Sequence, residues 1–65
     1  MIMKYFVLFR GKYPLRFMQP FGMFWVANIV GGEHVTLFDS EQAARNTAGN
    51  CFPAEEITIE KVVTP

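Results

Sequence analysis

The chain has little of the chemistry from which small domains are usually cross-linked or from which active sites are built. It contains one cysteine, one histidine and one tryptophan among 65 residues. A single cysteine excludes an intramolecular disulfide, and one thiol with one imidazole cannot complete a four-ligand zinc site. We therefore expect no metal and no cofactor, and a fold that depends on its apolar core and on association with a partner.

The sequence also lacks an apolar run long enough for a membrane span or a secretory signal. The run at residues 5–9 is short, and the stretch 17–30 is interrupted by Gln19, Pro20 and Asn28. A membrane-spanning helix needs roughly 20 consecutive apolar residues. We expect a cytoplasmic protein that makes no membrane contact.

Acidic residues are absent from the first part of the chain. The first thirty residues carry four basic side chains and no acidic one, whereas the remainder carries two basic and six acidic ones. The net charge of zero therefore hides a division between +4 and −4. Either the two halves form separate patches for electrostatic recognition, or ion pairs across strands neutralise them, and the sequence leaves both open.

What is present is a high content of hydrophobic residues, 51%, arranged in strand-like segments. The expected strands span residues 3–10, 13–18, 23–30, 33–38 and 55–63. The first strand is apolar on both faces and should be central, whereas Pro14 favours an edge position for the second. Gly31 and Gly32 predict a two-residue hairpin loop between the third and fourth strands.

One helix is expected before the last strand. Residues 39–42 carry an N-cap pattern, and Gly49 predicts a left-handed end to the helix. A stripe of small residues can lie close against a sheet: Ala43, Ala44, Thr47 and Ala48. The order β-β-β-β-α-β predicts a single small α+β domain over residues 1–65, with an antiparallel sheet of four to five strands.

Aromatic side chains concentrate in the segment RFMQPFGMFWVA, residues 16–27, around a Gln-Pro-Phe-Gly β-turn. One short helix can cover only part of one sheet face, so this segment should be half core and half contact surface. Phe21, Phe24 and Trp25 are the candidate hydrophobic anchors for a partner, because aromatic residues dominate interface hot spots. The alternative for each is the core, which is the expected place of Trp25.

Groups that could perform catalysis are few and scattered. His34 lies beside the Gly-Gly turn and is expected at the surface, and Cys51 is expected as a partly buried small apolar residue. Glu56 and Glu60 share a strand face but would be about 13 Å apart, too far for paired-carboxylate chemistry. We expect no catalytic residues and no enzymatic activity.

The first functional hypothesis is a protein-binding inhibitor or adaptor with an acidic surface. Its candidate partner-binding carboxylates are Asp39, Glu41, Glu55, Glu56 and Glu60. Suitably spaced anions can occupy the basic nucleic-acid channel of another protein. The alternative is a solvated helix cap and a charged edge strand that resists aggregation.

The strand, cap and helix segment TLFDSEQAARNTA, residues 36–48, in so short a chain resembles small phage-encoded accessory proteins. Anti-CRISPR proteins that act on type I systems are the nearest functional analogy, and the resemblance covers size and layout over the whole chain. It implies a protein without catalytic residues that works in the cytoplasm of a bacterial host. Its partner would be a CRISPR surveillance-complex subunit or the effector nuclease.

The second hypothesis is a sheet-based nucleic-acid-binding module. Exposed aromatics would stack bases, while Lys4, Arg10, Lys12 and Arg16 would follow the phosphate backbone. Zero net charge is unusual for such a domain, so nucleic acid is the less favoured ligand. A homodimer that pairs its apolar faces is a third alternative.

Overall fold

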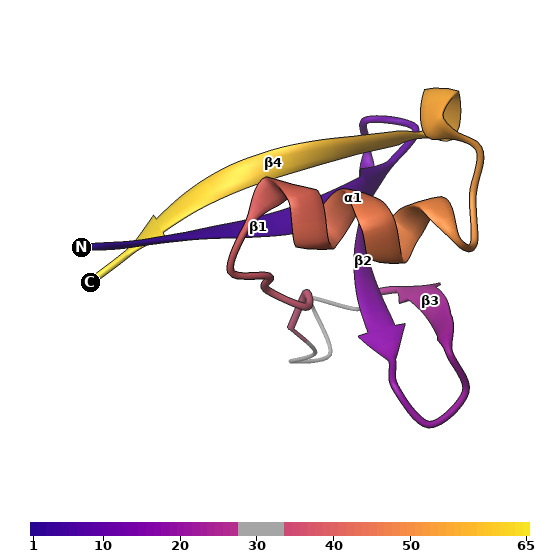
Figure 1. Cartoon of the computed structure of the whole chain (residues 1–65), viewed down its shortest axis with the longest axis horizontal. Coiled ribbons are helices and arrows are strands. Elements are labelled where there is room, and N and C mark those ends of the chain that lie inside the picture. Colours follow the sequence, from indigo (N-terminus) through magenta and orange to yellow (C-terminus); the bar gives the residue numbers. More distant parts are fainter. Residues whose placement is uncertain (28–33) are drawn as a thin grey trace.

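The structure, a computed structural model of the whole chain, describes residues 1–27 and 34–65. The elements follow in the order β1 (Ile2–Phe9), β2 (Tyr13–Met18), β3 (Met23–Val26), α1 (Glu41–Gly49), the 3-10 turn η1 (Ala54–Glu56) and β4 (Ile57–Thr64). The described strands form an antiparallel sheet in the order β3-β2-β1-β4, with α1 lying over one face (Figure 1). The α+β class, the antiparallel sheet and the helix before the last strand are confirmed.

β1 is central, as its two apolar faces predict. It pairs with β4 over its whole length, from Ile2↔Thr64 to Phe9↔Ile57. The edge position expected for β2 is wrong, because β2 lies between β3 and β1. Pro14 has no N–H to donate, but that N–H would point toward the last residues of the β3 ladder, so only one hydrogen bond at its end is lost. The carbonyl of Pro14 still accepts a hydrogen bond there, from Ala27 N–H at 2.9 Å.

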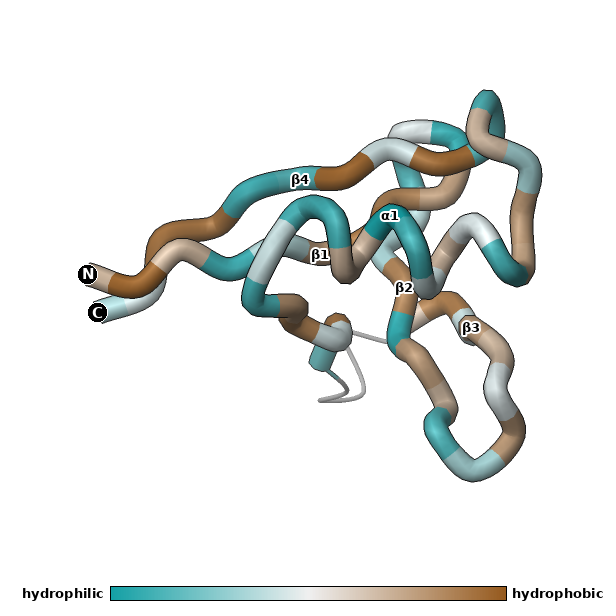
Figure 2. The backbone as a smooth tube through the Cα atoms, in the orientation of Figure 1, coloured by the Kyte–Doolittle hydropathy of each residue, from teal (hydrophilic) through white to brown (hydrophobic). Residues whose placement is uncertain are grey.

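β1 and β2 separate soon after the loop that joins them. Their ladder covers only Leu8↔Pro14 and Phe9↔Tyr13, so the sheet consists of two paired ribbons with a narrow connection. The β4–β1 ribbon carries α1, and the β2–β3 hairpin extends away from it (Figure 2).

The strand expected over residues 33–38 is wrong in its described part. Residues 34–37 are irregular, and Phe38 makes one isolated bridge with Tyr5 of β1. Thr36 instead contacts β2, since its N–H donates to Leu15 O at 3.4 Å and its Oγ1 accepts from Phe17 N–H at 2.8 Å. Residues 34–38 thus cross from β2 to β1 at the place where these two strands separate. They do not form a regular strand, because they do not stay beside one partner strand.

The hairpin expected between residues 23 and 38 is not borne out over its described part. β3 ends at Val26 instead of continuing to residue 30. The Gly31-Gly32 loop and residues 28–30 lie outside the described residues.

α1 begins with a side-chain cap. Ser40 Oγ accepts from Ala43 N–H at 3.0 Å, and Glu41 occupies the first turn, where a negative charge is favourable. The left-handed end expected at Gly49 is wrong, because Gly49 is still part of α1 and has no positive φ, and the cap residue Asn50 after it has a right-handed φ of −76°. Phe52 N–H donates to Ala48 O at 2.9 Å, so the chain leaves the helix in a tight turn.

The core lies between α1 and the face of the sheet that it covers. Its buried members are Val7, Leu15, Ala44, Ala48 and Ile57, and the partly buried residues packed on them are Tyr5, Phe9, Phe24, Phe38, Phe52 and Ile59. Ala44 and Ala48 are both fully buried, so these two members of the predicted small-residue stripe make the helix–sheet contact, whereas Thr47 is half-buried and the place expected for Ala43 is wrong because it is exposed. Small side chains there let the helix backbone approach the strands closely.

We predict that Ala48→Leu lowers the free energy of unfolding by about 1–3 kcal/mol, because the close contact leaves no room for a larger side chain. The matched control is Ala43→Leu on the exposed side of the same helix, with an expected change within about 0.5 kcal/mol. Urea unfolding followed by circular dichroism measures both. Equal effects of the two substitutions would contradict the tight helix–sheet contact.

Candidate binding surface on the β2–β3 hairpin

The β2–β3 hairpin is closed by the turn that the sequence predicts at residues 19–22. Gly22 N–H donates to Gln19 O at 3.3 Å, and Met18 O accepts from both Phe21 and Gly22 N–H, at 3.0 and 2.9 Å. Gly22 has a φ of +64°, a conformation that glycine adopts without strain. Phe21 therefore stands at the tip of the hairpin, where its side chain is 68% exposed.

One face of the hairpin belongs to the core. Phe24 packs against Phe17, with ring centroids 4.9 Å apart, and against Phe52 at 6.0 Å. Phe52 also contacts Phe9 of β1, at 5.1 Å. These rings connect the hairpin to the half of the sheet that α1 covers, so Phe24 occupies a packing position.

The opposite face of the hairpin is open. Arg16 and Trp25 are cross-strand partners there, as are Met18 and Met23. Trp25 is 59% exposed, so its expected place in the core is wrong. Because side chains alternate along a strand, Phe24 takes the inward position and Trp25 must point the other way.

A groove of about 440 Å³ lies on this hairpin, and we call it the hairpin groove. It is lined by Arg16, Met18, Phe21, Trp25 and Val26. Four of these side chains are apolar, and the guanidinium of Arg16 is the one charged group. Of the three predicted anchors, Phe21 and Trp25 line the groove, whereas Phe24 lies on the core side.

Arg16, Met18 and Val26 belong to the segment 16–27 that was expected to be half core and half contact surface, but none was predicted individually as a contact of a partner protein. Arg16 was named only as a phosphate contact of the nucleic-acid alternative. The alternation along the strand indicates that Met23 and Trp25 share a face. It does not show that Arg16 and Met18 lie beside them, because this depends on the pairing register of β2 and β3.

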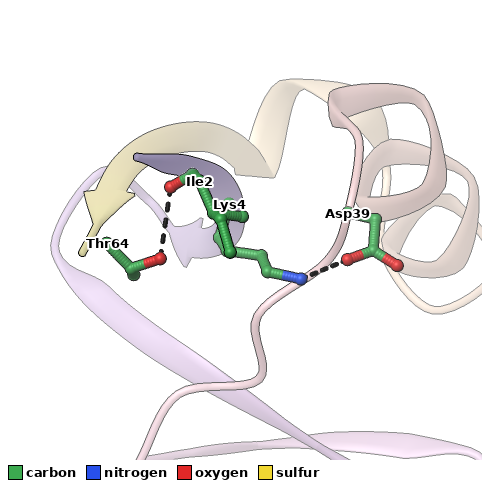
Figure 3. A network of polar contacts seen from close by, with 4 residues as sticks. All are labelled: Ile2, Lys4, Asp39 and Thr64. Carbon is green, nitrogen blue, oxygen red and sulfur yellow. Dashed lines mark hydrogen bonds and ion pairs between the residues drawn. The ribbon is translucent and has the colours of Figure 1, made fainter.

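The predicted acidic residues are largely engaged with basic residues of the same chain. Asp39 pairs with Lys4, as Figure 3 shows. Glu56 Oε2 lies 2.7 Å from Arg10 Nε, and Glu56 O accepts from Arg10 N–H, also at 2.7 Å. Both contacts join the basic first half of the chain to the acidic second half, so the ion-pair alternative accounts for these two carboxylates.

The remaining carboxylates do not gather in one place. Glu41 lies 3.6 Å from Arg45 within α1, while Glu55 and Glu60 are exposed and make no ion pair within the described part of the chain. Asp39 and Glu41 lie at the start of α1, whereas η1, with Glu55, follows its far end (Figure 1). The five predicted acidic residues are thus divided between the two ends of the helix and β4.

The basic residues of the nucleic-acid hypothesis are likewise separated. Lys4 and Arg10 are held in the ion pairs just described. Lys12 lies in the β1–β2 loop, with its Nζ 5.4 Å from the ring centre of Tyr13, the first residue of β2. Arg16 lines the hairpin groove. The structure does not bring the four side chains into a continuous basic track.

His34 and Cys51 are both exposed, so the partial burial expected for Cys51 is wrong. Cys51 Sγ lies 3.7 Å from Gly22 O, at the hairpin turn. In residues 1–27 and 34–65, no group of three or more His, Cys, Asp or Glu side chains is placed to hold a metal ion. Within the same ranges, no helix has the length and apolar character needed to cross a membrane.

Comparison of the chain with protein-family models, with curated proteins and with solved structures finds no match. The hairpin groove and the distribution of charge are therefore the features of the chain that bear on its function.

We predict that the Asp39 pKa depends on Lys4. The hydrogen bond from Lys4, and then its charge, lower the pKa of Asp39 below the ordinary value of 3.8. The unfolded chain then binds more protons than the native one near this pH, so the ion pair stabilises the fold above the ordinary pKa. Its contribution is lost as the pH falls through the native pKa.

The measurement is an NMR titration of the Asp39 carboxyl carbon. Lys4→Met should raise the Asp39 pKa toward 3.8, because the hydrogen bond and the positive charge are both removed. Lys61→Met, on the outer strand β4, removes an equal charge elsewhere and should leave the value unchanged. An unchanged Asp39 pKa in Lys4→Met would contradict this assignment.

Proposed function

We propose that this chain is a non-enzymatic protein-binding domain, an inhibitor or adaptor, which recognises a partner protein through the hairpin groove. The observation that carries the proposal is the exposure of Trp25 and Phe21, at 59% and 68%, beside a concave apolar surface. Tryptophan and arginine are the residue types most enriched in interface hot spots, and Arg16 is the cross-strand neighbour of Trp25. Exposed apolar surface of this kind is costly in a monomer and typical of contact sites.

A protein partner fits the groove better than a small molecule or a nucleic acid. Small-molecule sites of this size usually combine apolar walls with several convergent polar groups, and among the described residues Arg16 is the one polar side chain that lines this groove. Nucleic-acid binding draws its affinity from phosphate contacts. Two of the four proposed basic residues, Lys4 and Arg10, already neutralise carboxylates of the chain itself.

The acidic surface is the less supported route to the same class of function. Asp39, Glu41 and Glu56 are in ion pairs, which leaves Glu55 and Glu60 as the carboxylates that a basic partner would meet without competition in the described region. The resemblance in size and layout to anti-CRISPR proteins suggests a CRISPR-complex subunit as a candidate partner in the bacterial cytoplasm. That partner class is tested together with the groove.

We predict that truncating the groove abolishes partner capture. The parent chain and the double variant Phe21→Ala/Trp25→Ala are immobilised and exposed to nuclease-treated bacterial lysate that contains a type I CRISPR system. Loss of a hot-spot tryptophan typically costs at least about 2 kcal/mol of binding free energy, so proteins retained by the parent should be lost from the variant. Retained proteins are identified and quantified by mass spectrometry.

Two further baits act as controls. Val63→Ala removes an apolar side chain on β4 that is 51% exposed but lies outside the groove, so it should retain what the parent retains. Glu55→Lys/Glu60→Lys tests the acidic surface. Capture that survives loss of Phe21 and Trp25 but fails with the two lysines would overturn the groove in favour of the acidic surface. If the parent retains nucleic acid from untreated lysate but no protein from nuclease-treated lysate, the result favours the basic residues as a nucleic-acid-binding surface.

A further inference from the structure

The outer edge of β3 lies beside the hairpin groove and presents backbone groups for pairing. Ala27 N–H points toward β2, where it donates to Pro14 O at 2.9 Å. Backbone groups alternate in direction along a strand, so Phe24 and Val26 direct their N–H and C=O groups to the outer side. Within the described ranges, no backbone group pairs with Phe24 or Val26 on that side, and Cys51 Sγ lies 3.7 Å from Gly22 O at the turn end of the hairpin.

The groove beside this edge has a defined chemical character. Met18, Phe21, Trp25 and Val26 supply apolar walls, and Arg16 supplies a guanidinium that has no ion-pair partner within the described residues. A guanidinium next to apolar surface favours a carboxylate, which it can bind through two parallel hydrogen bonds. A ligand that fills the groove should therefore combine apolar and acidic side chains.

We propose that the hairpin groove and the β3 edge together bind an extended acidic and apolar segment of a partner protein, which adds to β3 as a further strand. The main chain of the segment takes the outward N–H and C=O groups of Phe24 and Val26. Side chains on one face of a strand are two residues apart, so the segment carries an apolar residue for the Trp25–Phe21 wall and a carboxylate two positions away for Arg16. This inference rests on the proposed function and specifies the ligand of the same site.

Trp25 is the single tryptophan of the chain, so its fluorescence reports occupancy of the groove without a label. The probes are two acetylated and amidated heptapeptides in which threonine alternates with leucine or a charged residue. The charged residue is glutamate in one peptide and lysine in the other. The glutamate peptide should shift Trp25 emission to the blue and bind the parent at least about tenfold more tightly than the lysine peptide.

Charge exchange at Arg16 is the decisive comparison. In Arg16→Glu the order of the two peptides should reverse, because the groove charge changes sign while its apolar walls remain. The matched control is Lys12→Glu, an equal change of charge in the β1–β2 loop outside the groove, which should keep the preference for glutamate. Circular dichroism confirms that each variant retains the fold.

Outcomes that contradict the inference show whether the predicted ligand or the predicted site is wrong. If Phe21→Ala weakens both peptides while Arg16→Glu leaves their order unchanged, the groove binds protein segments and the acidic preference is wrong. If a glutamate peptide with N-methyl groups along its backbone binds as tightly as the parent peptide, strand addition at β3 is wrong. If neither peptide alters Trp25 emission at millimolar concentration, the inference is overturned, and protein capture by the groove is decided by the lysate experiment alone.

Discussion

The packing of Phe52 between the two ribbons of the sheet determines how the β2–β3 hairpin is presented. The hairpin joins β1 through only two residue pairs, so its ladder does little to fix its orientation. Phe52 contacts Phe9 on one side and Phe24 on the other, and the end of α1 holds it through the bond from its N–H to Ala48 O. With Phe24 drawn to this side, Trp25 is directed to the open face by the alternation of the strand.

The small size of α1 explains why that open face exists. A helix of nine residues is about 13 Å long, and its buried side is made of alanines that lie over β1 and β4. Within the described part of the chain, Phe52 contacts the face of the hairpin that lies toward the helix, and no residue covers the opposite face. A chain with no disulfide and one short helix thus stabilises one face of its sheet and leaves apolar surface on the hairpin.

The local elements of this fold could be predicted from the sequence, whereas their long-range arrangement could not. The strands expected at 3–10, 13–18 and 55–63, the start of α1 and the turn at residues 19–22 depend on neighbouring residues, and these predictions hold. The crossing of residues 34–38 between β1 and β2 depends on partners far away in the chain. The ion pairs of Lys4 with Asp39 and of Arg10 with Glu56 likewise join residues 35 and 46 positions apart.

The candidate site could likewise be predicted only in part, because the faces of Phe24 and Trp25 depend on residues far away in the chain. The pattern of β3 indicates that Phe24 and Trp25 face opposite sides, but not which side meets the core. That choice is made by Phe52, which the sequence analysis did not connect with the hairpin. Arg16 became part of the site through its register with Trp25, which no local pattern specifies.

The most direct measurement is acrylamide quenching of Trp25 in the purified protein, over a range of protein concentrations. The structure predicts red-shifted emission and quenching close to that of a free indole at low concentration, because this one tryptophan is 59% exposed. Blue-shifted emission with strong protection at every concentration would contradict an open hairpin groove and return Trp25 to the core.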